Sequence, residues 1–535
     1  MTSDPHRYGE SGRYPRLWEA CAYCLASAVV IVIGAANLYL PFGPDQALIF
    51  HGAKLLDEGA VYYVDYWDNK QPGLYWFYLV AGRAFGFSEF GIHMLELLWM
   101  LAFAVVLMTT LRGAFRQPWL SAFAPVATIG VYYGLARENE LTQLEFLVSF
   151  PLFALVLCLI ASHRRPKAML AFYFASGLLA GVAVLFKLLL APLCVGLWLF
   201  ALVWHYRTHG SSIAELALRA VLPAALGVAL VLGSIVLLYA RLGHLDDLLW
   251  TAFVYPPQAL AFSPPASKTR LITAAAFFLS GFAPWVGFAL FASALWLWRR
   301  KDLLSALMLT WCVVGVALFL VQQVSWWHYH TLLVLFPAGI LAVLGIDRLC
   351  DWLVGAELGR AARRDVLAAL LVLTATADLF DATVRKAQPL LSSVAVTGEG
   401  VRGYQVQARV SEHYGRIQRG VEFLLQPDAL PGPIYAFGNA MVYEFSGRAS
   451  AHRTGGSSWE FYLPEQIDDI LASLDRLQAP YVFVDRLDHK LFRLRPKVTA
   501  YLNAHYVVHH TDESGTWLYR RDLTERRSGM GPGNS

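Results

Sequence analysis

Residues 17–40 read LWEACAYCLASAVVIVIGAANLYL, and this stretch holds a single charged side chain, Glu19. It is longer than the roughly 20 mostly apolar residues that a helix needs to cross the hydrocarbon core of a bilayer. A helix is expected because every backbone polar group must be paired within a spanning segment. The stretch is too long for the apolar region of a cleavable signal, and no A-x-A-like cleavage site follows it. It therefore predicts a retained first transmembrane helix.

Similar apolar stretches recur along the chain. Of the 535 residues, 57% are hydrophobic and 15% are charged, which is too apolar a balance for a soluble chain of this length. We expect a mainly α-helical, polytopic membrane protein with about eleven transmembrane helices and a small C-terminal α/β domain. The predicted spans are 17–40, 88–111, 118–136, 142–162, 168–187, 188–206, 218–240, 271–298, 303–323, 331–350 and 365–385.

Basic residues collect in alternate connections between these predicted helices, which assigns an orientation by the positive-inside rule. The residues after 385 and the acidic loop 41–87 then lie outside, and residues 1–16 lie in the cytoplasm. No basic stripe with interleaved aromatics suggests nucleic acid as a partner. The basic connections hold Arg7, Arg13, Arg16, Arg112, Arg116, Arg164, Arg165, Lys167, Arg207, Arg219, Arg299, Arg300, Lys301, Arg348, Arg360, Arg363 and Arg364.

The long apolar stretches end at about residue 385. The outer C-terminal region, residues 386–522, has the pattern of short helices and strands instead. A short apolar run stands at 434–437. An amphipathic helix is predicted at 464–477, a buried strand at 481–484, and a closing hairpin formed by 506–508 and 517–519. No cysteine follows Cys350, so we expect this region to lack disulfides. Residues 523–535 are polar and are predicted to be disordered.

The first outer loop carries the densest group of polar residues: residues 41–86 read PFGPDQALIFHGAKLLDEGAVYYVDYWDNKQPGLYWFYLVAGRAFG. A short helix on the membrane surface fits residues 45–58, with Asp45 in its first turn. Asp45 could be a helix N-cap or a catalytic acid. Lys70 could be an ordinary interfacial lysine or a contact for phosphate at headgroup depth.

This loop resembles the first outer loop of the GT-C glycosyltransferases, in the protein O-mannosyltransferase and aminoarabinose-transferase-like branch. The resemblance rests on Pro44-Asp45-Gln46 and on Trp67-Asp68-Asn69-Lys70-Gln71-Pro72-Gly73. Relatives have an acid just after the first helix, then a surface helix and a Lys-Pro-Pro-Gly-like turn. Here Gln71 replaces the first proline, and Gln46 stands where the mannosyltransferases have a second acid.

Further positions extend the resemblance along the chain. Glu145 matches an acid at the start of a helix above the family's active site, and Lys187 matches a lysine after the fifth span. Their alternative roles are a helix-start acid and a snorkelling lysine. His328 and His330, in Trp326–His330, resemble the family's His-Tyr motif and could contact a phosphate or a divalent cation. No cofactor or metal ligand is assigned.

The resemblance implies a reaction: transfer of a sugar from a polyprenyl-phosphate donor to an envelope glycolipid, polysaccharide or protein at the outer face, with inversion. Asp45 would be the catalytic base, and Glu145 would orient the acceptor or share the base role. Lys70, Lys187, His328 and His330 would contact the donor phosphate, and Tyr66, Trp67 and Asp68 would contact the acceptor or the sugar.

The implied organisation is a GT-C-like catalytic domain over residues 17–385, in a bacterial inner (plasma) membrane and in contact with its lipids, with the active site and residues 386–522 facing the periplasm. A lipid-linked sugar flippase or transporter is the main alternative, although no internal repeat is visible. An outer binding module on a membrane anchor is a third hypothesis, but an anchor needs far fewer spans.

Overall fold

The computed structural model describes residues 17–263, 266–298, 302–354, 361–397, 412–457, 459–486 and 495–523. The chain divides into two compact units, each described by itself. The helical unit comprises Met1–Leu38, His93–Ser234 and Ala266–Gln388. The loop–sheet unit comprises Tyr39–Ile92, Ile235–Pro265 and Pro389–Ser535, so it joins the first outer loop with the C-terminal strands.

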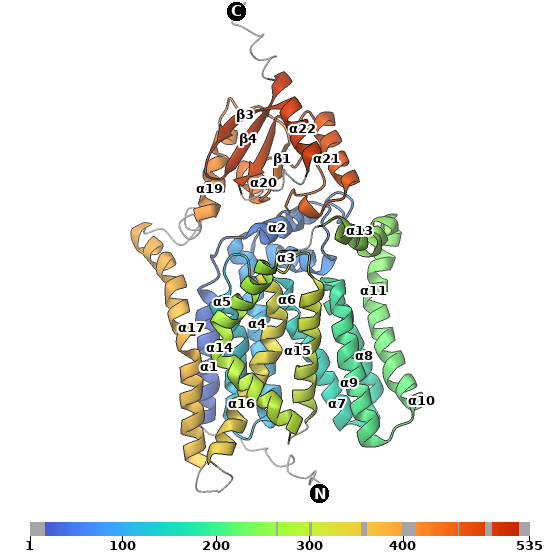
Figure 1. Ribbon diagram of the computed structural model, residues 1–535, viewed down its shortest axis with the longest axis vertical. Coiled ribbons are helices and arrows are strands. Elements are labelled where there is room, and N and C mark those ends of the chain that lie inside the picture. The colour runs from blue at the N-terminus through green and yellow to red at the C-terminus, as the bar shows by residue number, and fades with distance from the viewer. Residues whose placement is uncertain are drawn as a thin grey trace, which may run out of the picture. The chain divides into compact units, whose positions relative to one another are not determined.

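Long apolar helices build the helical unit (Figure 1). Helices α7, α8 and α9 pack against one another, and α16 packs against α14 and α15. Their bounds are α1 (Leu17–Ala35), α4 (Glu89–Leu111), α7 (Ser149–Arg164), α8 (Met169–Phe186), α9 (Ala191–His209), α11 (Leu222–Leu242), α14 (Lys268–Trp298), α15 (Leu303–Val321), α16 (Leu332–Val354) and α17 (Ala361–Thr397).

Helix α16 is the most enclosed element of the helical unit. In the most apolar 18-residue part of His328–Val354, 89% is buried, whereas the corresponding share in Lys268–Trp298 is 22%. A Cβ added at Gly345 would lie 2.0 Å from the backbone oxygen of Phe288, so glycine is what lets α16 approach α14 this closely. Small residues at helix contacts are the usual way for membrane helices to gain packing energy without a hydrophobic driving force.

Nine of the eleven predicted spans coincide with helices that are long and apolar enough to cross a membrane, among the residues the structure describes. The chain is an integral membrane protein. The count of eleven is not confirmed, because the apolar helix in the first span is shorter, Glu19–Ala35. The span at 118–136 is a 3₁₀ turn (Pro118–Phe123), a π turn (Val126–Gly130) and the short helix α5 (Val131–Leu135). Pro125 lies inside this segment and removes a backbone donor, which favours irregular helical geometry, whereas Pro118 begins the 3₁₀ turn, where a missing N–H costs little.

The loop–sheet unit combines surface helices with a four-stranded sheet of order β1-β2-β4-β3. Strands β1 and β2 pair in parallel, and β4 pairs antiparallel with β2 and β3. The predicted amphipathic helix, buried strand and hairpin are confirmed, and the helix predicted over residues 45–58 is present as α2, whose position on a membrane surface stays a prediction. The bounds are α2 (Pro44–Asp57), α3 (Pro72–Phe85), α12 (Leu245–Leu249), α13 (Tyr255–Phe262), α19 (Glu412–Gly420), β1 (Ile434–Phe437), α20 (Met441–Ser446), α21 (Pro464–Arg476), β2 (Tyr481–Asp485), α22 (Pro496–His505), β3 (Tyr506–Thr511) and β4 (Gly515–Arg520).

Burial of one face of α21 stabilises this sheet region. Ile467, Ile470, Leu471 and Leu474 recur at helical spacing and are buried. Strand β2 follows α21 and is buried along its whole length, so the helix and the central strand share one core. The tight β3–β4 turn is closed by Asp512, whose carboxylate accepts the backbone N–H groups of Ser514 and Gly515 at 2.7 and 3.2 Å.

We predict that Leu474→Ala destabilises the sheet region by about 2–5 kcal/mol, because it leaves a cavity in a closed core. Leu477→Ala is the matched control: Leu477 is 44% exposed, whereas Leu474 is 0% exposed. Hydrogen–deuterium exchange of the full-length protein should show faster exchange in β2 and β4 for Leu474→Ala only. Equal exchange in the two variants would contradict the packing described.

Candidate functional site

Asp45 lies in the first turn of α2 but does not cap the helix. The N-cap is Gly43, and Pro44 occupies the first helical position, where its missing N–H costs nothing. The side chain of Gln46 accepts the Gly43 N–H at 2.9 Å. The capping role considered for Asp45 therefore belongs to Gln46, and Asp45 presents its carboxylate at the positive end of the helix dipole.

The ammonium group of Lys70 lies between two carboxylates. Its Nζ is 3.1 Å from Asp68 Oδ2 and 3.4 Å from Asp45 Oδ1. Burial by itself lowers the pKa of Lys70, but the two acids outweigh it and hold that pKa above its ordinary value. Lys70 therefore remains a cation throughout the physiological pH range.

The two acids beside Lys70 differ in accessibility. The Asp68 side chain is 4% exposed and also accepts the Tyr75 hydroxyl at 2.8 Å and the Asn69 N–H at 2.7 Å. The Asp45 side chain is 25% exposed. Asp68 thus anchors Lys70 within the loop, and Asp45 is the carboxylate of this group that a ligand can reach.

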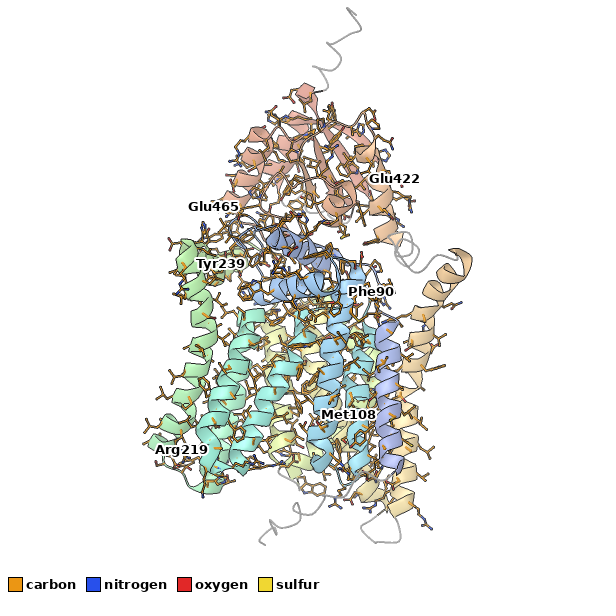
Figure 2. All side chains as sticks on the ribbon, turned by 180° about the vertical axis from the view of Figure 1, so that it is seen from behind. Phe90, Met108, Arg219, Tyr239, Glu422 and Glu465 are labelled. Carbon is orange, nitrogen blue, oxygen red and sulfur yellow. The ribbon has the colours of Figure 1, made fainter. Side chains whose placement is uncertain are left out.

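Aromatic side chains build the wall of the loop. The hydroxyls of Tyr62 and Tyr63 both donate to the backbone oxygen of Lys70, at 2.8 and 2.7 Å. Burial raises the pKa of both tyrosines, so they stay protonated donors. Tyr239, labelled in Figure 2, belongs to the segment Ile235–Pro265 of the same unit and donates to the Tyr62 backbone oxygen at 3.0 Å.

Tyr66 and Trp67 are each 1% exposed. The Tyr66 hydroxyl donates to the Leu48 backbone oxygen at 2.8 Å, and Trp67 Nε1 donates to Thr251 Oγ1 at 3.1 Å. In this structure both rings, like Asp68, hold the loop together. Contact with sugar or acceptor stays a prediction for these three residues.

Helix α2 is tied to α20 by a buried acid. Glu444 accepts hydrogen bonds from His51 Nδ1 at 2.9 Å and from Lys54 Nζ at 2.6 Å, and the His51 ring stacks on Tyr443. Burial opposes ionisation of Glu444, but the His51 hydrogen bond and the Lys54 ammonium outweigh it and lower its pKa. The helix that carries Asp45 is thereby fixed to the element next to β1.

A cavity of about 560 Å³ lies beside His51, the residue that donates to Glu444. His51 lines it together with Arg453, Arg476 and the hydrogen-bonded pair His452–Asp469, whose Nε2···Oδ2 distance is 2.9 Å. The lining mixes acids, bases and donors, which suits a polar ligand better than a hydrocarbon chain.

A second group of predicted residues lies within the helical unit. Lys187 Nζ is 2.7 Å from Glu145 Oε1 and 2.8 Å from Gln322 Oε1, and His330 Nε2 is 3.6 Å from Glu145 Oε1. Glu145 is 3% exposed, and its other oxygen has no hydrogen-bond partner among the described residues. Lys187 therefore does more than snorkel, since its ammonium is bonded to two side chains from other helices.

His328 forms its ion pair with a different acid from the one in this group. Its Nε2 pairs with Glu140, which is 1% exposed and also accepts the Arg137 N–H at 2.7 Å. Binding of phosphate or of a divalent cation by His328 and His330 stays a prediction.

The sequence analysis missed Glu96, Glu140 and Gln322. Glu96 is fully buried in α4 and accepts hydrogen bonds from the hydroxyls of Tyr132 and Thr142. A lone acid within an apolar span is a recognisable signal, because such a residue must find partners inside the protein. Gln322 carries no comparable signal.

Comparison with known proteins identifies the fold. The sequence matches no protein-family model, and a search of curated proteins found no match. Among solved structures, the crystal structure of ArnT from Cupriavidus metallidurans bound to undecaprenyl phosphate superimposes with a TM-score of 0.59 at 13% sequence identity, covering 94% of this chain and 97% of that one. The apo state of the same protein gives a TM-score of 0.58 at 16% identity, covering 96% and 99%.

ArnT is a GT-C aminoarabinose transferase, and the likeness extends over nearly the whole of both chains. This chain therefore has the GT-C fold, as the resemblance of its first outer loop predicted. At these identities the comparison shows the fold alone.

We predict that Glu444→Gln destabilises the packing of α2 against α20 by about 1–3 kcal/mol at pH 7, because His51 and Lys54 lose a charged acceptor. A carboxyl group whose pKa is lowered on folding stabilises the folded state at pH values above its unfolded pKa of about 4.3. This stabilisation is lost as the pH falls through the folded pKa. Thermal unfolding of wild type and variant should therefore differ at pH 7 and converge in acid. The exposed Glu422→Gln is the control (Figure 2). A difference that persists unchanged below about pH 3 would contradict the ion-pair origin.

Proposed function

We propose that the protein is a membrane glycosyltransferase that moves a sugar from a polyprenyl-phosphate donor to an envelope glycolipid, polysaccharide or protein at the outer face. The observation that carries the proposal is the Asp45–Lys70–Asp68 group, with a fixed cation beside an accessible carboxylate. The GT-C fold supports it, since the ArnT structure of that fold holds undecaprenyl phosphate.

Both lysines of the proposal keep capacity for a phosphate. An ammonium has three N–H donors. Lys70 directs two of them to Asp68 and Asp45, and Lys187 directs two to Glu145 and Gln322. In each case a third donor is left for a phosphate oxygen, and a charge-assisted hydrogen bond of this kind is among the stronger ones.

Asp45 is the proposed base. Its side chain is 25% exposed. The Asp68 side chain is 4% exposed, and its oxygens already accept hydrogen bonds from Lys70, Tyr75 and Asn69. Asp45 would accept the proton of the acceptor hydroxyl as oxygen attacks the anomeric carbon. Attack opposite the departing lipid phosphate inverts that carbon, and the phosphate leaves without protonation because Lys70 balances its charge.

Two further assignments follow from the remaining groups. Glu145 is a second candidate base, since one of its oxygens lacks a partner among the described residues. Lys187, His328 and His330 are second candidates for the donor phosphate. The cavity beside His51 is the proposed acceptor pocket, because about 560 Å³ accommodates one or two sugar units.

We predict that Asp45→Asn lowers transfer by about 10²–10⁴-fold, because the amide cannot take the hydroxyl proton. The control is Asp57→Asn, at the other end of α2, where Asp57 forms an exposed ion pair with Arg83. Mass spectrometry of envelope glycolipids and glycans from cells carrying each variant should show a sugar addition that only Asp45→Asn loses.

Two outcomes would contradict this proposal. Normal sugar addition by Asp45→Asn at equal protein level would remove Asp45 from the base role. Movement of a lipid-linked sugar across proteoliposomes, with no sugar transfer by the wild type in cells or in vitro, would favour the flippase.

We predict that Lys70→Ala weakens binding of undecaprenyl phosphate by about 10–100-fold, the value of one charge-assisted hydrogen bond to a partly buried anion. Lys497→Ala is the control, since Lys497 is an exposed lysine paired with Asp468. Native mass spectrometry of the detergent-purified protein titrated with undecaprenyl phosphate measures both. Equal affinities for the two variants would exclude Lys70 as a phosphate contact.

A further inference from the structure

Three histidines gather at the ends of α7 and α9, apart from every residue assigned above. In the described part of the chain, His163, His205 and His209 form the one group of three metal-binding side chains whose ligand atoms all lie within 4.8 Å of one another. We propose that these three imidazoles form a binding site for a divalent transition-metal ion, with Zn²⁺ as the expected ion.

The helix geometry brings the rings together. His205 and His209 are four residues apart and so share one face of α9, where their ring centroids are 4.2 Å apart. His163, at the end of α7, adds a ring 4.6 Å from His209 and 5.9 Å from His205. Tetrahedral Zn²⁺ with Zn–N bonds of about 2.0–2.1 Å needs nitrogens roughly 3.3 Å apart. Changes of side-chain rotamer can close the remaining gap.

The ring nitrogens lack partners that would explain their burial. His205 is 3% exposed, and Nδ1 of both His163 and His205 is buried with no hydrogen-bond partner among the described residues. Buried polar atoms are nearly always paired in native proteins, so two unpaired nitrogens within one histidine cluster indicate a missing ligand. His209 Nδ1 is 3.0 Å from Thr208 Oγ1, which leaves Nε2 for coordination and orients the ring from outside the site.

The chemistry of the ligand set selects the kind of ion. Three neutral imidazoles without a carboxylate suit Zn²⁺ and its first-row neighbours and disfavour Mg²⁺ and Ca²⁺, which prefer oxygen. Of the nearby charges, Glu215 and Arg219, which both act on His205, pair with each other at 2.8 Å, whereas Arg164 adds a positive charge that acts on His163. His209 is exposed, so water can fill the fourth position.

The site is separate from the proposed catalytic residues of the helical unit. Glu145 and His163 lie at opposite ends of the α6–α7 segment (Leu144–Arg164; Figure 1), 18 residues or about 27 Å apart along a helix. The histidines lie at the end that carries Arg164 and Arg207, which the charge pattern assigns to the cytoplasm. An ion there would join the ends of α7 and α9 as a structural clamp.

The test is metal binding by the untagged, full-length protein, since a histidine tag would bind the same ions. Cys21→Ser/Cys24→Ser serves as the background, because these two cysteines are exposed. After chelator treatment, Zn²⁺ loading and desalting, plasma mass spectrometry should find about one Zn²⁺ per chain. His209→Ala and His205→Ala should each bind at least about tenfold more weakly. The control His244→Ala, on an exposed histidine paired with Asp247, should bind normally.

A second readout separates metal binding from a folding defect. Co²⁺ in the wild-type site should give the visible absorption of tetrahedral Co²⁺, and Zn²⁺ should displace it. Zn²⁺ should also raise the melting temperature of wild type and of His244→Ala but not of His209→Ala, whose exposed position tolerates substitution. Retention of one Zn²⁺ by His209→Ala and His205→Ala, or failure of the folded wild type to hold Zn²⁺ or Co²⁺, would overturn the proposal.

Discussion

The first outer loop is organised around one buried ion pair, between the Lys70 ammonium and the Asp68 carboxylate. Asp68 also accepts from Tyr75, and the backbone oxygen of Lys70 accepts from Tyr62 and Tyr63. A buried carboxylate in an ion pair needs its remaining lone pairs satisfied as well, and the Tyr75 hydroxyl and the Asn69 N–H do this for Asp68. These hydrogen bonds fix the turn that leads into α3, and they hold Lys70 where it meets Asp45.

Much of the fold was predictable because its causes are local. A bilayer forces each spanning segment to pair its own backbone, so nine predicted spans coincide, among the residues described, with helices such as α4 and α9. A continuous apolar run located β2, and amphipathic spacing located α21. The segment at 118–136 departs from the expected single α-helix, because Pro125 removes a backbone donor inside it while the residues remain apolar. Hydropathy does not register that difference.

The candidate site was predictable residue by residue but not contact by contact. Asp45, Lys70, Glu145 and Lys187 were identified from their positions, but their pairings depend on tertiary packing. Lys187 bonds Gln322, which is 135 residues away in the chain, and Trp67 bonds Thr251 across 184 residues. Sequence position also cannot show burial, so Tyr66 and Trp67 resembled ligand contacts but are closed within the loop. The four-residue spacing of His205 and His209 places both on one helix face, but only the fold shows that His163 lies beside them.

The pairing of both candidate lysines with acids has a consequence for turnover. A polyprenyl-phosphate sugar is a phosphodiester with one negative charge, whereas the released polyprenyl phosphate is a monoester that carries nearly two at neutral pH. A lysine without acidic neighbours would hold that product more tightly than the donor. In the Asp45–Lys70–Asp68 group two carboxylates surround one ammonium, so the added charge of the product meets repulsion as well as attraction. Under the proposed reaction Asp45 holds the acceptor's proton when the lipid phosphate is released, so Asp68 repels the product at once and Asp45 adds to this repulsion only after it has lost the proton. Lys70 can then bind the donor phosphate without trapping the enzyme in its product complex.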